Sequence, residues 1–179
     1  GQQFESGIPV TRNSNSDGKT RRALPKEVRR EQLIRATMKC IARTGLSGVT
    51  MARVTTEAGL SLGIANLHFE SKEKLLLATL QYVTAEYNRD QRSILESGDY
   101  PSLAAQIEAL LQFDFSAAVT EKDKMAVWFA FASEARARID YKRICGAQDK
   151  KIFAITLKLC DELIHLGGKQ HYMHARAMA

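Results

Sequence analysis

The sequence lacks any run of 18 apolar residues, so it predicts no helix that spans a membrane. No positively charged segment followed by an apolar stretch opens the chain, which gives no sign of a secretory leader. Cysteine is scarce as well, and Cys40, Cys145 and Cys160 lie far apart among apolar residues. Such an odd, scattered set favours reduced, buried thiols over a disulfide framework. We therefore expect a cytoplasmic protein with no membrane partner.

Proline is almost absent, since only positions 9, 25 and 101 carry it, and Pro25 and Pro101 each suit the first turn of a helix. No segment alternates apolar and polar residues for long enough to predict a strand. The sequence therefore predicts an all-α fold. The expected helices cover about 26–44, 51–58, 62–68, a long segment after Ser71, 101–118, 121–138 and 141–166.

Short polar side chains mark the expected helix starts, because a side-chain oxygen can accept a hydrogen bond from an N–H of the first turn. Thr50, Ser61 and Ser71 are the expected caps of the second, third and fourth helices. Thr120, with Asp123 three residues later, resembles a capping box. Asp140 is the expected cap of the last long helix.

The common catalytic motifs are missing too. The sequence has no glycine-rich phosphate loop, no His-Glu-x-x-His and no nucleophile elbow, so we expect no enzyme and no cofactor. His165, His171 and His174 lie near Cys160, but their spacing is unusual for zinc ligands, so no metal site is predicted. An all-α metal-binding enzyme stays as the less favoured alternative.

The first half of the chain contains few acidic residues. Residues 1–80 carry 13 Lys and Arg against 7 Asp and Glu, whereas residues 81–179 carry 13 of each. The whole net charge of +6 therefore belongs to the first 80 residues, and seven basic residues lie between positions 19 and 35. A basic half joined to a neutral half is typical of a polyanion-binding domain attached to another unit. A solvated basic face without a partner is the competing interpretation.

Residues 50–61 fit a helix-turn-helix unit, in which two short helices flank a turn of three or four residues. Ala58 is small enough to let the two helices cross closely. Gly59 accepts a backbone angle that other residues resist. By geometry alone this pattern is only moderately specific, because many helical pairs share it.

The wider stretch 50–80, TMARVTTEAGLSLGIANLHFESKEKLLLATL, resembles the DNA-binding signature of the TetR family of transcriptional regulators. The matching positions are Thr50, Ala58-Gly59-Leu60-Ser61, Gly63, His68-Phe69, Ser71-Lys72 and Leu75-Leu76. The resemblance implies a three-helix helix-turn-helix domain followed by an antiparallel helical effector and dimerisation domain. The chain departs from the family at Asn66, where a Tyr is usual.

This resemblance implies a double-stranded DNA operator as partner, with the third helix in the major groove. Phosphate contacts are then expected from Thr50, Ser61, His68 and Lys72. Base-side contacts are expected from Leu62, Ile64, Asn66 and Leu67, because apolar side chains suit thymine methyl groups and an amide can read an adenine edge. Gly63 belongs to the same DNA-facing set, while Phe69 is expected in the core.

Residues 126–136, AVWFAFASEAR, resemble the effector domain of the BetI-like branch, whose namesake controls choline–betaine genes. The implied partner is a small-molecule effector of unknown identity. The candidate pocket residues are Tyr87, Phe113, Trp128, Phe129 and Phe131. Core packing is the competing interpretation for each aromatic side chain. Trp128 is the first choice for the pocket, because a lone indole can stack on a cationic ligand.

Three segments are therefore expected: a flexible basic arm at 1–24, a helix-turn-helix domain at 25–71 and an effector-binding and dimerisation domain at 72–179. TetR members usually continue with two further helices that form the dimer interface. We expect a homodimer and a truncated last domain, and the alternative is that this chain dimerises in another way. The predicted function is a sequence-specific repressor that a small molecule releases from its operator. An architectural DNA-binding protein without an effector is the main alternative.

Overall fold

The computed structural model describes residues 25–169 and 174–178, and in these ranges it contains helices and turns but no strand. The expected basic arm and His171 lie outside the described residues. The described helices are α1 Lys26–Thr44, α2 Met51–Ala58, α3 Leu62–His68, α4 Lys72–Glu96, α5 Leu103–Asp114, α6 Ala117–Thr120, α7 Lys122–Glu134, α8 Ile139–Leu166 and α9 Ala175–Met178. The predicted all-α fold is confirmed.

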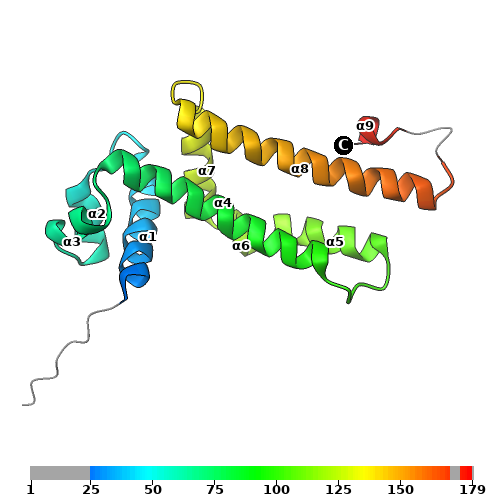
Figure 1. Ribbon diagram of the computed structural model, residues 1–179, viewed down its shortest axis with the longest axis horizontal. Helices are drawn as coiled ribbons and strands as arrows, with labels where there is room; N and C mark the ends of the chain where they lie inside the picture. Colours follow the sequence, from blue (N-terminus) through cyan, green and yellow to red (C-terminus); the bar gives the residue numbers. More distant parts are fainter. Residues whose placement is uncertain (1–24, 170–173, 179) are drawn as a thin grey trace, which may run out of the picture.

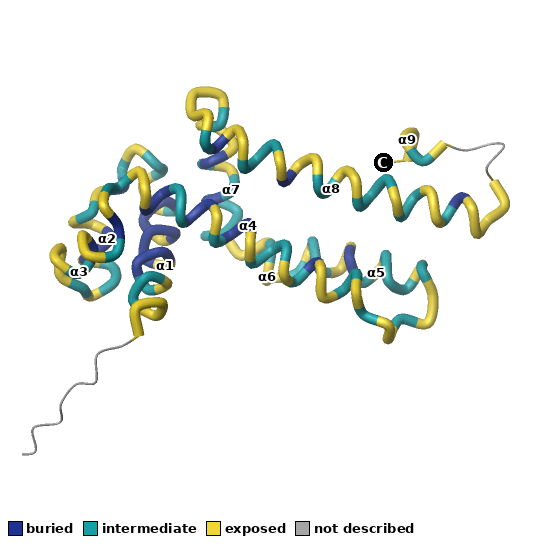
Figure 2. Tube along the Cα trace, viewed as in Figure 1, coloured by how far each residue is buried: buried dark blue, intermediate teal, exposed yellow. Residues whose placement is uncertain are grey.

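The helices form a small head at one end, made of α1 to α3, and a longer body made of α5 to α8 (Figure 1). The long helix α4 starts in the head and runs into the body, so it is the covalent link between the two parts. Figure 2 shows that burial is concentrated in α1 and the first half of α4, whereas most of α8 is exposed or half-buried.

The core of the head forms because α1 has an apolar stripe at helical spacing. The residues of this stripe are buried, and they are Leu33, Ala36, Thr37, Cys40 and Ile41. Val54 of α2, Ala65 of α3 and Leu75 of α4 are fully buried against it. Each buried Val or Leu side chain contributes about 1.5–3 kcal/mol relative to an exposed one.

The boundaries of the head helices follow from local hydrogen bonds. The hydroxyls of Thr50, Ser61 and Ser71 each accept a backbone N–H three residues ahead, at 3.1, 3.2 and 3.2 Å. Gly59 ends α2 in the left-handed conformation, with φ of 66°. The three predicted caps and the predicted turn are therefore confirmed.

The head and the body share one hydrophobic core. Val127 and Phe131 of α7 and Tyr141 of α8 belong to the same buried cluster as the head residues. The rings of Phe131 and Tyr141 meet edge to face, with 4.9 Å between centroids. The body is therefore joined to the head through packed side chains of α7 as well as through α4.

The predicted helix over 101–118 is wrong, because the structure has two helices there. α5 begins after Ser102, whose hydroxyl accepts the N–H of Ala105, so Pro101 lies before the helix and not in its first turn. The Ser116 hydroxyl donates to the carbonyl of Phe113 at 2.6 Å. This bond competes with the helical pattern, so α5 ends at Asp114 and the short α6 follows.

Two further cap predictions are wrong. The Thr120 hydroxyl donates to the carbonyl of Ser116 at 2.8 Å, so it belongs to the end of α6 and does not cap α7. Asp140 lies inside the first turn of α8, which begins at Ile139. Pro25 likewise precedes α1 as its N-cap residue and does not enter the first turn.

The three cysteines are free, as expected for reduced thiols. Cys40 is buried, and burial raises the pKa of its thiol. Cys145 and Cys160 are only half-buried, so the prediction that all three are buried is wrong for these two. They lie on α8, which has little covering it in this chain.

Candidate nucleic-acid interface and ligand cavity

Helix α3 is held by one buried side chain and leaves most of its surface open. Ala65 is its single buried residue. Leu62 and Leu67 are 49% and 80% exposed, and Asn66 and Gly63 are also exposed. Leucines that a two-turn helix exposes to solvent do not stabilise the fold. The exposed face therefore fits a contact with another molecule.

The other predicted DNA-contact residues lie within α3 or at the starts of α2, α3 and α4. Thr50 and Ser61, which cap α2 and α3, are exposed. Ile64, His68 and Lys72 are half-buried, so part of each side chain remains accessible. Apart from Thr50 at the start of α2, the predicted residues thus lie on α3, at its cap or in the first turn of α4.

The turn between α3 and α4 is tied to α1. The Arg30 guanidinium donates from Nη1 to the carbonyl of His68 at 2.9 Å and lies 4.4 Å above the ring centroid of Phe69. Phe69 is 4% exposed, so its predicted place in the core is confirmed. The buried Nδ1 of His68 has no hydrogen-bond partner among the described residues.

Several basic residues of the head are neutralised by ion pairs. Lys39 and Arg43 of α1 both contact the carboxylate of Glu57 on α2, and the Arg43 contact lowers the pKa of Glu57. Arg53 donates to the carbonyl of Gly48 at 2.6 Å, which fastens the turn between the two helices. These contacts fix α2 relative to α1, although the sequence analysis did not single them out.

A small cavity of about 10 Å³ lies in the body between α4, α5, α6 and α7. Tyr87, Phe113 and Trp128 all line it, and the first two rings lie 5.4 Å apart between centroids. A second, larger and more open cleft of about 240 Å³ shares Tyr87 and Trp128 and extends towards α8. The structure therefore brings three of the five predicted pocket residues together.

The other two predicted pocket residues do not line this cavity. Phe131 is 0% exposed and packs against Tyr141 in the shared core, so it has no surface left for a ligand. Phe129 is 67% exposed and lines neither of the two clefts. Their place on α7 explains this result, because residues 128, 129 and 131 point in three different directions around a helix. The structure therefore does not bring these two predicted residues to the cavity.

Polar groups complete the cavity. The Tyr87 hydroxyl donates to Asp114 at 2.8 Å, and burial together with this hydrogen bond raises the pKa of Tyr87. Glu86 and Lys124 form an ion pair in the cavity wall, and the Lys124 ammonium also donates to the carbonyl of Ala118 at 3.0 Å. Tyr87 therefore remains a neutral donor at any physiological pH.

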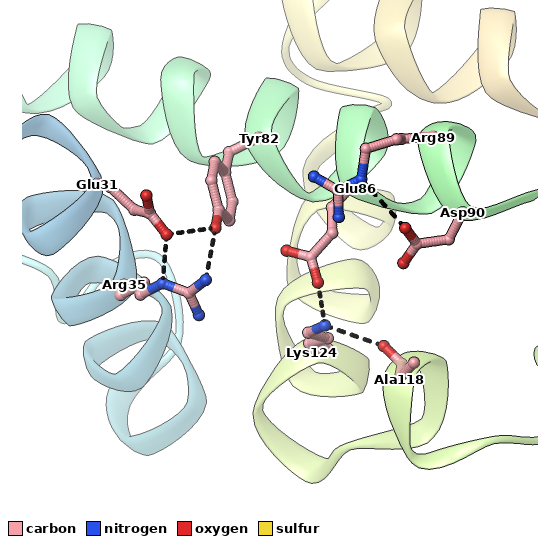
Figure 3. Close-up of polar contacts among 8 residues, drawn as sticks. All are labelled: Glu31, Arg35, Tyr82, Glu86, Arg89, Asp90, Ala118 and Lys124. Atoms are coloured by element: carbon pink, nitrogen blue, oxygen red, sulfur yellow. Dashed lines mark hydrogen bonds and ion pairs between the residues drawn. The ribbon is translucent and has the colours of Figure 1, made fainter. Parts of the chain in front are cut away.

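A polar cluster joins the head to the body one helical turn away from this ion pair (Figure 3). The Tyr82 hydroxyl donates to Glu31 at 3.0 Å and accepts from Arg35 at 2.8 Å, so α4 is bonded to α1. Burial and the Glu31 contact raise the pKa of Tyr82 to about 12. The hydrogen bond to Glu31 raises the pKa of Arg35, and the Glu86 carboxylate adds to this rise.

Neither this cluster nor the Glu86–Lys124 pair was predicted from the sequence. Their partners are distant in the chain, since Tyr82 lies 51 residues from Glu31 and Lys124 lies 38 residues from Glu86. The sequence carries only a weak sign of these contacts. Tyr82 and Glu86 are polar residues spaced four apart on a helix whose other face is apolar.

Membrane-spanning helices and metal sites were not predicted from the sequence. No described helix is long and apolar enough to cross a bilayer. No group of three or more His, Cys, Asp or Glu residues within 25–169 and 174–178 is arranged to hold a metal ion.

Comparisons with known proteins point to one family. Residues 33–79 match the model of "Bacterial regulatory proteins, tetR family". The HTH-type transcriptional regulator BetI of Brucella canis is 33% identical over 136 residues, which cover 76% of this chain and 68% of that protein. BetI of Stenotrophomonas maltophilia is 31% identical over 140 residues, covering 78% and 69%.

Solved structures agree on the fold. The ketosteroid transcriptional regulator KstR2 of Mycobacterium tuberculosis has a TM-score of 0.65 at 19% identity, over 78% of this chain and 69% of that one. A TetR transcription regulator from Haloarcula marismortui has a TM-score of 0.68 at 18% identity, over 79% and 73%. At these identities the likeness concerns the arrangement of helices alone.

Proposed function

Because the chain belongs to the tetR family of bacterial regulatory proteins, we propose that it is a repressor that binds an operator through α3 and is released by a small molecule held in the body. One observation carries the DNA-binding part of this proposal. The face of α3 that carries Leu62, Asn66 and Leu67 is exposed, although nothing in the fold of the chain requires it to be apolar. The repressor acts as a homodimer in the cytoplasm.

The proposed contacts with DNA divide into two kinds. Leu62, Ile64, Asn66 and Leu67 meet base edges in the major groove, where leucines suit thymine methyl groups and Asn66 suits adenine. Thr50, Ser61, His68 and Lys72 meet phosphates, which fix the register of the protein on the duplex but carry no sequence information. Residues 25–71 are then the domain that binds DNA, and residues 72–179 are the domain that binds the effector.

Gly63 offers a test that separates DNA binding from stability. An added Cβ at this position would meet only the Ser61 hydroxyl oxygen, at 3.8 Å, so Gly63→Ala fits the folded chain. We expect the free energy of unfolding to stay the same or rise by less than about 1 kcal/mol, because Ala favours helix. Operator affinity should fall by about tenfold or more, because the methyl group separates the backbone of α3 from the DNA.

The matched control for Gly63→Ala is Gly98→Ala, which also adds a methyl group in open space but lies beyond the end of α4. Gel-shift titrations with the operator and denaturant unfolding of both variants give the comparison. Unchanged operator affinity in Gly63→Ala would place this part of α3 away from the DNA.

The proposed effector site is the larger cleft beside Tyr87 and Trp128, together with the small cavity that these two residues share with Phe113. Carboxylates outnumber cations around it, since Glu86, Asp90, Asp114 and Asp149 line the two clefts and Lys124 is the one cation among their lining residues. A ligand with a positive charge on an apolar body fits these walls, because the aromatic rings cover its apolar surface and the carboxylates stabilise its charge.

Coupling between the two sites runs along α4. A ligand beside Glu86 disturbs the ion pair with Lys124, and Glu86 lies one turn from Tyr82, which is bonded to Arg35 and Glu31 of α1 (Figure 3). The two heads of a dimer must reach half-sites about 34–36 Å apart. A ligand that favours a different separation of the heads weakens operator binding by thermodynamic linkage.

The experiment for the effector site compares three ligands of one shape: an aryl-alkyl quaternary ammonium, its uncharged carbon isostere and an anionic sulfonate analogue. We expect the cation to release the operator at the lowest concentration. Trp128→Leu should raise the concentration for half-release about 2- to 30-fold, because a cation–π contact contributes about 0.5–2 kcal/mol. Gel shifts with added ligand measure this effect.

Phe129→Leu is the matched control, because Phe129 is the next aromatic side chain on α7 and faces solvent. It should leave the response to the cation unchanged. Equal responses to all three ligands would refute the charge preference. A protein that binds DNA but responds to no ligand of any charge would favour the architectural alternative.

A further inference from the structure

Arg30 makes two contacts with the segment that ends the recognition helix, although it lies 38 residues earlier in the chain. Its Nη1 donates to the carbonyl oxygen of His68, the last residue of α3. Its guanidinium plane lies over the buried ring of Phe69, the residue that follows. One side chain of α1 thus holds both the backbone and the ring at the end of α3.

Helix α3 depends on these contacts because it is short and has little buried surface. It has seven residues, of which only Ala65 is buried. Its first turn is fixed by the Ser61 cap. At its other end the N–H of Phe69 bonds to the carbonyl of Ala65, whereas the carbonyl of His68 lies beyond the last helical hydrogen bond. A cation at this end is favoured by the helix dipole as well as by the hydrogen bond. The final turn also carries Asn66 and Leu67, two of the proposed base contacts.

We propose that Arg30 is a positioning residue for operator recognition, which sets the orientation of the last turn of α3 and acts through His68 and Phe69 instead of touching DNA itself. This proposal rests on the proposed function of α3 as the base-reading helix. The proposed role accounts for a difference between Arg30 and its neighbours at the start of α1, because Arg30 contacts the end of α3. Arg29, the adjacent residue, donates only to Gln32 of its own helix.

Arg29→Met and Arg30→Met are a matched pair for the test, because each removes one positive charge from the same turn of α1. Affinities for the operator and for a scrambled duplex are measured with the full-length protein at several salt concentrations. The ratio of the two affinities is independent of the folded fraction, because both come from one preparation. A purely structural loss of stability therefore leaves this ratio unchanged.

For Arg30→Met we expect the ratio of operator to scrambled affinity to fall about tenfold, comparable to losing one well-placed base contact. The slope of log affinity against log salt should stay at the wild-type value, because no phosphate contact is lost. Arg29→Met should keep the wild-type ratio. A loss that is equal for both duplexes and lowers the slope would instead make Arg30 a phosphate contact and overturn the proposal.

Arg30→Lys covers the case in which Arg30→Met does not fold. A lysine keeps the charge, but a point donor cannot both stack on Phe69 and bond the His68 carbonyl as a guanidinium does. We expect an intermediate fall of about threefold in the ratio, with unchanged affinity for the scrambled duplex. A full wild-type ratio in Arg30→Lys overturns the proposal. If the wild-type protein itself shows no preference for any operator, the proposed function fails and not the role of Arg30 alone.

Discussion

Raising the salt concentration from about 50 to about 200 mM should weaken operator binding about 10³- to 10⁵-fold, the range for a protein with about six to ten phosphate contacts. Among the described residues of α1 to the first turn of α4, five cations form no ion pair: Lys26, Arg29, Arg30, Arg53 and Lys72. Arg30 is bonded to the carbonyl of His68, which leaves four for contacts with phosphate. Two protomers double this number, which places a dimer within that range. The physical cause is the release of counterions from the DNA when these cations replace them.

Substitution of Lys72 tests whether one cation contributes to the salt dependence of DNA binding. Lys72→Ala should weaken binding to all sequences alike and lower the salt slope by about 0.9 for each lost contact. Lys74→Ala is the matched control, because Lys74 lies two residues further along α4 and pairs with Glu70. Filter-binding titrations over a salt series measure both slopes. A salt-independent affinity of the wild-type protein would contradict the assignment of the basic half to DNA.

Phe131→Ala should lower the free energy of unfolding by about 3–5 kcal/mol, whereas Phe129→Ala should change it by less than about 0.5 kcal/mol. Phe131 is fully buried where α7 and α8 join the head, and its removal leaves a cavity beside Tyr141. Phe129 is two residues away on the same helix but faces solvent. The same chemical change is therefore made in two opposite environments.

Denaturant unfolding of the two alanine variants gives this comparison directly. The midpoint should fall strongly for Phe131→Ala, because a typical domain is stable by only about 5–15 kcal/mol in total. Phe131→Leu should recover a large part of the loss by filling most of the cavity. Similar midpoints for the two alanine variants would mean that the junction between head and body contributes little to stability.

The parts of the fold that were predicted from sequence depend on local interactions. Thr50, Ser61 and Ser71 cap their helices through N–H groups three residues ahead, and Gly59 ends α2 by its own backbone conformation. These contacts are readable from a few neighbouring residues. Ser116 and Thr120 have the same kind of side chain, but they bond to preceding carbonyl groups and end helices there. Composition alone does not distinguish the two uses of a hydroxyl.

The site was predicted less completely because α7 is surrounded by different partners. It packs against the head, against α8 and beside the cavity, so an aromatic side chain on any of its faces has an apolar neighbour available. Val127 and Phe131, spaced four apart, share the face towards the head. Trp128 lies on the cavity side. Only the position of α7 relative to the other helices decides which ring meets a ligand.

Trp128 is the single tryptophan of the chain, and it forms part of the wall common to both clefts. All indole fluorescence of the protein therefore originates at the proposed effector site. A bound molecule that displaces water from the ring or stacks on it will shift or quench this emission, with no competing signal from another indole. The repressor consequently carries its own optical probe, and ligands can be titrated against the unlabelled protein before any operator sequence is known.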